Sequence, residues 1–167
     1  MESLMKVLVT GSNGFIGKNL IAEMEATTEH EILSYDRDTD VSLINSYCEK
    51  ADFVFHLAGV NRPETEAEFM MGNFGFTSTL LDMLKKHNNT CPVMISSSIQ
   101  AAISNPYGES KKAGEDLLKA YSDETSTDVL IYRFPNVFGK WCRPNYNSAV
   151  ATFCHNIAHD LPIQVND

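Results

Sequence analysis

The sequence predicts an α/β fold, a doubly wound parallel sheet of the Rossmann type. Segments with the composition of buried strands alternate along the chain with segments that carry apolar residues at helical spacing. The first strand-like segment also runs into a glycine-rich turn, from Gly11 to Gly17, directly before a helical segment. Because right-handed crossovers join parallel strands, repeated strand-helix-strand units place helices on both faces of the sheet.

Short segments rich in β-branched and other apolar residues are expected as strands. In chain order they cover residues 7–9, 31–35, 53–57, 92–96 and 129–132. The run 53–57, FVFHL, is almost continuously apolar, as expected for a strand that is covered on both faces.

Segments with apolar residues every three or four positions are expected as helices. They cover residues 15–24, 42–50, 66–87 and 105–121. Gly72 and Gly75 argue against an unbroken helix over 66–87, because glycine weakens helix interiors. A polar loop at 59–65, which contains Pro63, comes before this helix.

Length and composition fit one globular domain. The chain has 167 residues, of which 43% are hydrophobic, enough for one core and too few for a second full domain. A net charge of -9 and a pI of about 4.9 disfavour nucleic acid or an anionic membrane as partner, because both attract basic surfaces.

The cysteines give no sign of a metal site or of a disulfide framework. Cys48, Cys91, Cys142 and Cys154 are far apart and form no CxxC pair. The N-terminus shows no charged leader followed by a long apolar run, and no apolar stretch reaches membrane-spanning length. We therefore expect a soluble cytoplasmic protein.

The glycine-rich turn has the pattern of a phosphate-binding loop. Gly11 can adopt a backbone conformation closed to other residues, Gly14 leaves room for a pyrophosphate, and Gly17 lets the helix approach the strand. Free amides at the helix start then face the anion. Similar turns also occur without a ligand, so polar residues at other strand ends must support the assignment. The residues expected to contact a dinucleotide here are Gly11, Asn13, Gly14, Phe15, Ile16 and Gly17.

The second strand ends in Asp36-Arg37, a pair that fits two cofactors. Asp36, about twenty residues after the last motif glycine, can accept a hydrogen bond from the adenosine ribose 2′-hydroxyl of NAD. Arg37 can instead pair with the 2′-phosphate of NADP, so the choice stays open. Asp40 and Val41 lie where an adenine edge would meet a carboxylate and an amide, although Asp40 is equally typical of a turn or a helix cap.

The third strand ends in small residues that let a cofactor approach the backbone. We expect Leu57, Ala58 and Gly59 to contact the dinucleotide, because ligands of such sheets bind beyond the carboxyl ends of the strands. His56, just before them, has no partner visible in the sequence and is expected to be a packed strand histidine.

The segment after the fourth strand carries a candidate acid-base pair. Tyr107 and Lys111 are four residues apart, so both project from one face of a helix. A neighbouring ammonium favours the phenolate, and we expect it to lower the pKa of Tyr107 from its ordinary value near 10. Ser98, at the strand end, could hold a substrate oxygen beside the phenol.

The order of these motifs resembles that of the extended short-chain dehydrogenases/reductases, the NAD-dependent epimerase/dehydratase family, which act on nucleotide sugars. The resemblance spans nearly the whole chain. It rests on Thr10–Gly17, His56–Gly59, Asn73, Ser96–Ser98, Tyr107–Lys111 and Arg133–Gly139.

A narrower resemblance concerns the segments HLAGVNRPE, SSSIQA, NPYGESK and FGKWCRPNYNS, which look like those of 4-keto nucleotide-sugar reductases of capsular polysaccharide synthesis. It implies Tyr107 as proton donor, Lys111 holding the nicotinamide ribose and tuning Tyr107, and Ser98 polarising the ketone. NADP(H) is the implied cofactor, with NAD(H) as the alternative. The implied substrate is a UDP-linked keto-sugar of the UDP-2-acetamido-2,6-dideoxyhexose type, and the resemblance allows a homodimer.

The same resemblance implies further roles. Arg133 and Asn73 are expected to support the site, and Ser96 and Phe134 to contact the cofactor. Residues expected on the nucleotide-sugar side are Asn136, Lys140, Arg143 and Asn147.

Some features depart from the family pattern. Ile99 and Gln100 stand where 4,6-dehydratases carry an Asp-Glu pair, which disfavours dehydration, and the short connection 99–106 implies an open site. The reductases resembled here carry a C-terminal cupin domain with 3-epimerase activity. We therefore expect residues 1–167 to be one NAD(P)-binding domain that stops near the start of the substrate subdomain, without a cupin. A 4-epimerase that keeps its NAD bound and a non-catalytic nicotinamide-binding module remain the alternative functions.

Overall fold

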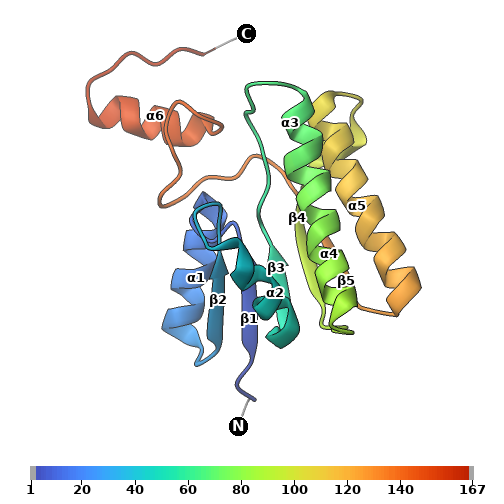
Figure 1. The fold of residues 1–167 in the computed structure, drawn as a ribbon. Coiled ribbons are helices and arrows are strands. Elements are labelled where there is room, and N and C mark those ends of the chain that lie inside the picture. Colours follow the sequence, from blue (N-terminus) through green and yellow to red (C-terminus); the bar gives the residue numbers. More distant parts are fainter. Residues whose placement is uncertain (1–2, 166–167) are drawn as a thin grey trace. The chain divides into compact units, whose positions relative to one another are not determined.

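The computed structural model describes residues 3–165, and the chain divides into two compact units, Met1–Phe134 and Pro135–Asp167. The first unit contains one parallel sheet with the strand order β2-β1-β3-β4-β5 (Figure 1). Its strands are β1 (Lys6–Thr10), β2 (Glu31–Tyr35), β3 (Phe53–His56), β4 (Val93–Ser98) and β5 (Val129–Phe134). The predicted doubly wound parallel sheet is confirmed.

Helices connect these strands in the expected places. In the first unit they are α1 (Phe15–Thr27), α2 (Val41–Lys50), α3 (Ala67–Phe69), η1 (Met70–Gly75), α4 (Phe76–Lys86), η2 (Ile99–Ala102) and α5 (Pro106–Thr125). Asp40 caps α2 and Asn105 caps α5, each by accepting a hydrogen bond from a backbone amide of the first turn. Among residues 3–165, no helix has both the length and the apolar composition needed to cross a membrane.

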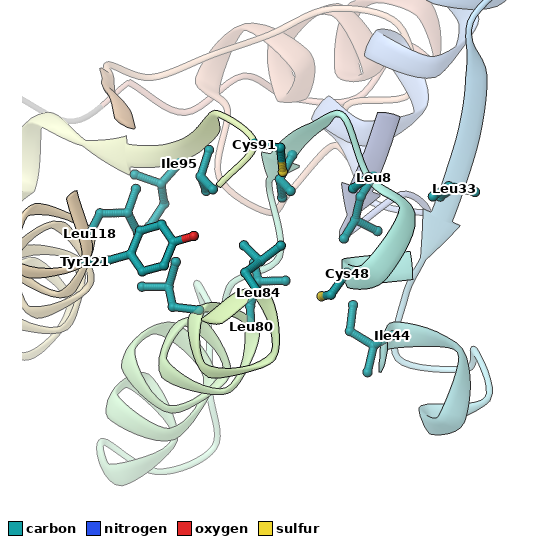
Figure 2. Packing of buried hydrophobic residues seen from close by; sticks show 14 residues of the cluster. Leu8, Leu33, Ile44, Cys48, Leu80, Leu84, Cys91, Ile95, Leu118 and Tyr121 are labelled. Carbon is teal, nitrogen blue, oxygen red and sulfur yellow. The ribbon is translucent and has the colours of Figure 1, made fainter. Parts of the chain in front are cut away.

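The core has two parts, one on each face of the sheet. Val7 and Val9 of β1 pack with Met24 of α1, whereas Leu8, between them, faces the opposite side. On that opposite side α2, α4 and α5 cover the strands, and their buried side chains gather in one cluster (Figure 2). Its labelled members are Leu8, Leu33, Ile44, Cys48, Leu80, Leu84, Cys91, Ile95, Leu118 and Tyr121.

The cysteines behave as the sequence predicts for unpaired residues. All four are free thiols, and Cys48 and Cys91 lie in the core. Burial raises the pKa of each of these two thiols to about 12, so they stay protonated and unreactive at neutral pH.

The helix predicted over 66–87 is continuous but changes its winding. Segment η1 is a π-helical turn between α3 and α4, so Gly72 and Gly75 mark a change of pitch and not a break. A side chain at Gly72 would meet Val60, since its Cβ would lie 2.2 Å from the Val60 Cγ2. The wider turn buries Asn73, which becomes important for the site.

The second unit contains α6 (Ala149–Ala158), which the sequence analysis does not predict. Ser148 caps it by accepting a hydrogen bond from the Ala151 amide at 3.3 Å. A cap residue directly before an apolar run is the sequence signal that could have identified this helix.

The packing in Figure 2 predicts a large cost for shortening a core side chain. Leu84 is 0% exposed, so Leu84→Ala should lower the free energy of unfolding by about 2–5 kcal/mol. Leu43→Ala is the matched control, because Leu43 is 38% exposed and should cost about 1 kcal/mol or less. Urea unfolding followed by circular dichroism measures both, and equal losses would contradict this description of the core.

Candidate functional site

The glycine turn after β1 is closed to side chains at two positions. Gly11 has φ of 72°, and a Cβ there would lie 2.7 Å from the Ala58 amide nitrogen. A Cβ at Gly17 would lie 2.3 Å from the Gly11 carbonyl oxygen, so this glycine lets α1 lie against the turn. The geometry matches the expected roles of both residues.

The N-terminus of α1 is open to an anion. Gly14 is the N-cap and is exposed, no side chain caps the first turn, and that turn contains no acidic residue. The amides of this first turn therefore have no side-chain acceptor. They lie next to the turn Gly11–Gly17, the glycine cradle. These residues fit the pyrophosphate of a dinucleotide.

Asp36, after β2, stabilises the glycine turn by hydrogen bonds. One carboxylate oxygen accepts a hydrogen bond from the Asn13 amide and the other from the Arg37 amide, both at 2.7 Å. The carbonyl of Tyr35 also accepts the Gly11 and Ser12 amides. Asp36 thus ties the end of β2 to the turn, while the neighbouring Arg37 is exposed.

Asp40 acts as a helix cap. Its carboxylate accepts a hydrogen bond from the Ser42 amide at 2.9 Å, and this bond, with one from the Ser42 side chain, holds the pKa of Asp40 below its ordinary value. The helix-cap interpretation is therefore confirmed. Contacts of Asp40 and the exposed Val41 with adenine stay a prediction.

His56 lies in a directed chain of buried hydrogen bonds, which confirms the prediction of a packed strand histidine. The hydroxyl of Thr77 donates to the Asn73 carbonyl at 2.5 Å, so it accepts from Nε2 of His56, 2.8 Å away. Nδ1 of His56 then accepts from the Thr10 hydroxyl at 2.7 Å, and that hydroxyl accepts the Ala58 amide at 3.3 Å. Both ring nitrogens of His56 and the hydroxyls of Thr10 and Thr77 therefore each have a hydrogen-bond partner.

Burial and the nearby Lys111 charge lower the pKa of His56 to about 3, so the imidazole is neutral in the folded protein at pH 7. Ser96 of the neighbouring strand β4 donates to the His56 carbonyl at 3.4 Å. His56 therefore links Thr10 of β1 to Thr77 of α4 and carries no charge for catalysis.

Asn73 holds the loop after β3. Its side-chain oxygen accepts the Val60 amide and its nitrogen donates to the Val60 carbonyl, each at 3.0 Å. The same nitrogen donates to the Ser110 hydroxyl at 2.9 Å, which connects the loop to α5. A Cβ at Gly59 would lie 3.3 Å from Nζ of Lys111, so the lysine ammonium lies against the end of β3.

Tyr107 and Ser98 are brought together as the sequence predicts. The Ser98 side chain lies beside the Tyr107 phenol, and the Tyr107 ring packs on Phe69 of α3 with centroids 5.6 Å apart. The expected direction of the tyrosine pKa is wrong. Burial raises the pKa of Tyr107 above 10, and the nearby Ser98 side chain only partly opposes this shift.

Lys111 is buried, 9% exposed, one turn further along α5. Burial lowers the pKa of its ammonium from 10.5 to about 8, and the charge of Glu115 opposes that shift. The amine is therefore mostly charged at pH 7 and titrates closer to neutrality than an exposed lysine.

Glu115 is a site residue that the sequence analysis missed. Its carboxylate is 1% exposed and accepts two hydrogen bonds from Arg133, at 2.7 and 2.6 Å, and one from Ser97 at 2.6 Å. Burial alone would raise the pKa of Glu115, but these partners hold it below its ordinary value. Its spacing of four residues from Lys111 is the sequence signal that could have identified it.

The expected nucleotide-sugar residues lie in the second unit, apart from the catalytic candidates in sequence. Asn136, Lys140, Arg143 and Asn147 belong to the segment before α6. Lys140 places Nζ 4.3 Å from the ring centroid of Trp141, and the Arg143 guanidinium lies 5.6 Å from the Tyr146 ring. Phe134, the last residue of the first unit, stacks with Tyr132.

The residues at the edge of the first unit suit an organic cofactor. Over residues 3–165 there is no group of three or more histidine, cysteine or acidic side chains arranged to hold a metal ion. The glycine cradle, the open α1 terminus and the Tyr107-Lys111 face all lie on elements that follow strand ends.

Comparison with known proteins supports this description. Residues 7–167 match the model of the NAD dependent epimerase/dehydratase family. The chain is 48% identical over 163 residues to a UDP-2-acetamido-2,6-beta-L-arabino-hexul-4-ose reductase of Pseudomonas aeruginosa, covering 98% of this chain and 44% of that protein.

Solved structures agree. The capsular polysaccharide assembling protein CapF of Staphylococcus aureus superposes with a TM-score of 0.87 at 51% identity, over 98% of this chain and 44% of that one. A UDP-glucuronic acid 4-epimerase of Bacillus cereus in complex with NAD has the same fold, with a TM-score of 0.82 at 20% identity over 96% of this chain and 66% of that one. The chain spans less than half the length of the reductase and of CapF.

The neutral, buried His56 predicts a specific pH dependence of stability. Its folded pKa of about 3 lies below the ordinary 6.5, so its contribution is complete above pH 6.5 and is lost as the pH falls from 6.5 toward 3. The slope from this group approaches about 1.4 kcal/mol per pH unit. His56→Gln should be less stable at pH 7 yet lack this slope.

Urea unfolding at pH 7, 6 and 5 measures the effect. His159→Gln, at an exposed position, is the matched control and should keep the wild-type slope. A wild-type slope that survives in His56→Gln would contradict the assignment of a neutral histidine.

Proposed function

The chain belongs to the NAD dependent epimerase/dehydratase family, and on that premise we propose that it reduces the C4 ketone of a UDP-linked deoxy-sugar. The proposed substrate is of the UDP-2-acetamido-2,6-dideoxyhexose type, the proposed hydride donor is NADPH, and the product serves capsule or surface polysaccharide synthesis. The similarity to the Pseudomonas aeruginosa reductase and to CapF supports this choice. The observation that carries it is the placement of the Ser98 side chain beside the Tyr107 phenol, one helical turn from the buried Lys111.

Tyr107 is the proposed proton donor. Reduction of a ketone leaves a negative charge on its oxygen, which needs a proton in the transition state. Since burial raises the pKa of Tyr107, the phenol stays protonated at neutral pH and is ready to donate. Ser98, beside the phenol, can donate a second hydrogen bond to the same substrate oxygen and so orient it.

Lys111 is proposed to hold the cofactor. Its ammonium lies against Gly59, one helical turn from Tyr107 and beyond the end of β3, where the nicotinamide ribose would bind. Its three N–H donors suit the hydroxyls of a ribose. The negative charge of Glu115 raises the pKa of Lys111, so a larger fraction of the amine stays protonated than burial alone would permit.

The nicotinamide cofactor fits the glycine cradle. Gly11, Gly14 and Gly17 leave the backbone bare, and the amides at the start of α1 would receive the pyrophosphate. When bound, the reduced nicotinamide supplies the hydride. NADPH is proposed over NADH because the exposed Arg37 can pair with a 2′-phosphate.

Replacement of the proton donor gives the first test. Tyr107→Phe removes only the hydroxyl, so turnover should fall by about 10²-fold or more while NADPH affinity and thermal stability change little. Turnover is measured as NADPH oxidation with a UDP-linked 4-keto-sugar, in the complete natural polypeptide. Tyr47→Phe, on α2, is the control and should keep full turnover. Retained turnover in Tyr107→Phe would falsify the assignment.

Cofactor choice is tested separately. NADPH should bind more tightly than NADH, and Arg37→Ala should weaken NADPH binding by roughly tenfold or more, because it removes a charge-assisted contact, while NADH binding is unchanged. Lys50→Ala, at the far end of α2, controls for the loss of a positive charge. Calorimetric titration gives the affinities. Stoichiometric NAD in the purified protein, with no NADPH oxidation, would point instead to a 4-epimerase.

A further inference from the structure

The segment before α6 contains a strained tryptophan at the centre of a turn. The Cys142 amide donates to the Gly139 carbonyl at 3.1 Å, which closes a turn with Lys140 and Trp141 in the middle. Trp141 has φ of 65°, a conformation that a turn normally gives to glycine and that is unfavourable for a bulky side chain. Strain of this kind persists where a side chain is needed in a particular place.

The strained side chain is presented outward with a cation on one face. Trp141 is 48% exposed, and Nζ of Lys140 lies 4.3 Å from its ring centroid. A few residues on, the Arg143 guanidinium lies beside the Tyr146 ring. Four neighbouring residues thus combine two aromatic surfaces with two positive charges.

The charge of this stretch is opposite to that of the whole chain. The protein has a net charge of -9, yet no aspartate or glutamate occurs between Asp128 and Asp160, an interval that contains Lys140 and Arg143 besides Arg133, whose charge is paired with Glu115. A local positive charge in an acidic protein favours an anionic ligand at this segment. An exposed aromatic ring beside such charges favours a ligand that is also aromatic.

We propose that Trp141 is the stacking surface for the base of a nucleoside diphosphate, and that Lys140 and Arg143 pair with its phosphates. A base can stack on the indole while the neighbouring cations meet the diphosphate, so one turn recognises both parts of the ligand. The identification of this nucleotide as the UDP part of the sugar substrate rests on the proposed function. Trp141 is then a specificity residue for the nucleotide and takes no part in proton transfer.

A dinucleotide cofactor also contains a base and a diphosphate, so the test must separate the two sources. Trp141 is the only tryptophan of the 167-residue chain, and its fluorescence therefore reports on this turn alone. UDP should quench the emission saturably, both in the free chain and in the chain saturated with NADPH. Uridine should bind more weakly than UDP because it lacks the phosphates. Quenching by NADPH that prevents any effect of UDP would overturn the proposal.

A glycine substitution separates recognition from folding. Trp141→Gly relieves the backbone strain, so the melting temperature should stay equal or rise while calorimetric titration shows UDP affinity reduced at least about tenfold. Phe138→Ala, at another exposed aromatic of the segment, should keep UDP affinity. A role in packing alone predicts the reverse, a lower melting temperature with unchanged UDP binding, and that result would overturn the proposal.

The proposal and the proposed reaction can fail independently. Saturable quenching by UDP supports the role of Trp141 even if the complete polypeptide oxidises no NADPH. Conversely, normal ketone reduction with an unchanged KM for the UDP-sugar in Trp141→Gly would overturn the role of Trp141 and leave the reaction intact.

Discussion

The buried ammonium of Lys111 is the constraint on which the catalytic end of the first unit depends. A charge so far from water is costly unless a partner offsets the cost, and here the partner is Glu115 on the same helix. Glu115 is itself buried and needs Arg133 from β5 and Ser97 from β4. The Glu115 carboxylate therefore fixes how α5 lies on two strands.

Neutral hydrogen bonds perform the corresponding task between α5 and the elements β1, β3 and η1. The chain from the Ala58 amide through Thr10, His56 and Thr77 ends at the Asn73 carbonyl, and the Asn73 side chain then reaches Val60 and Ser110. Because a buried network is stable only when it is fully satisfied, it sets a single arrangement of β1, β3, η1 and α5. The glycine cradle and the acid-base pair are thereby held in one rigid frame.

Local patterns in the sequence predict most of the fold and the placement of Tyr107 and Lys111 on one helix, because strand runs, helical spacing and caps such as Asp40 depend on near neighbours. The pKa of Tyr107 could not be predicted in the same way. Its direction is decided by burial, which depends on Phe69 and other residues distant in sequence. The pairing of Glu115 with Arg133 and the π-helical turn around Asn73 likewise arise from tertiary packing.

The pKa of Lys111 is the most direct measure of whether the site is built around a compensated buried charge. It can be followed by NMR of side-chain-labelled lysine, with Lys111→Met to assign the resonance. We expect titration near 8, below the ordinary 10.5, and a further decrease in Glu115→Gln, because Glu115 raises this pKa. An ordinary pKa that Glu115→Gln leaves unchanged would contradict the account.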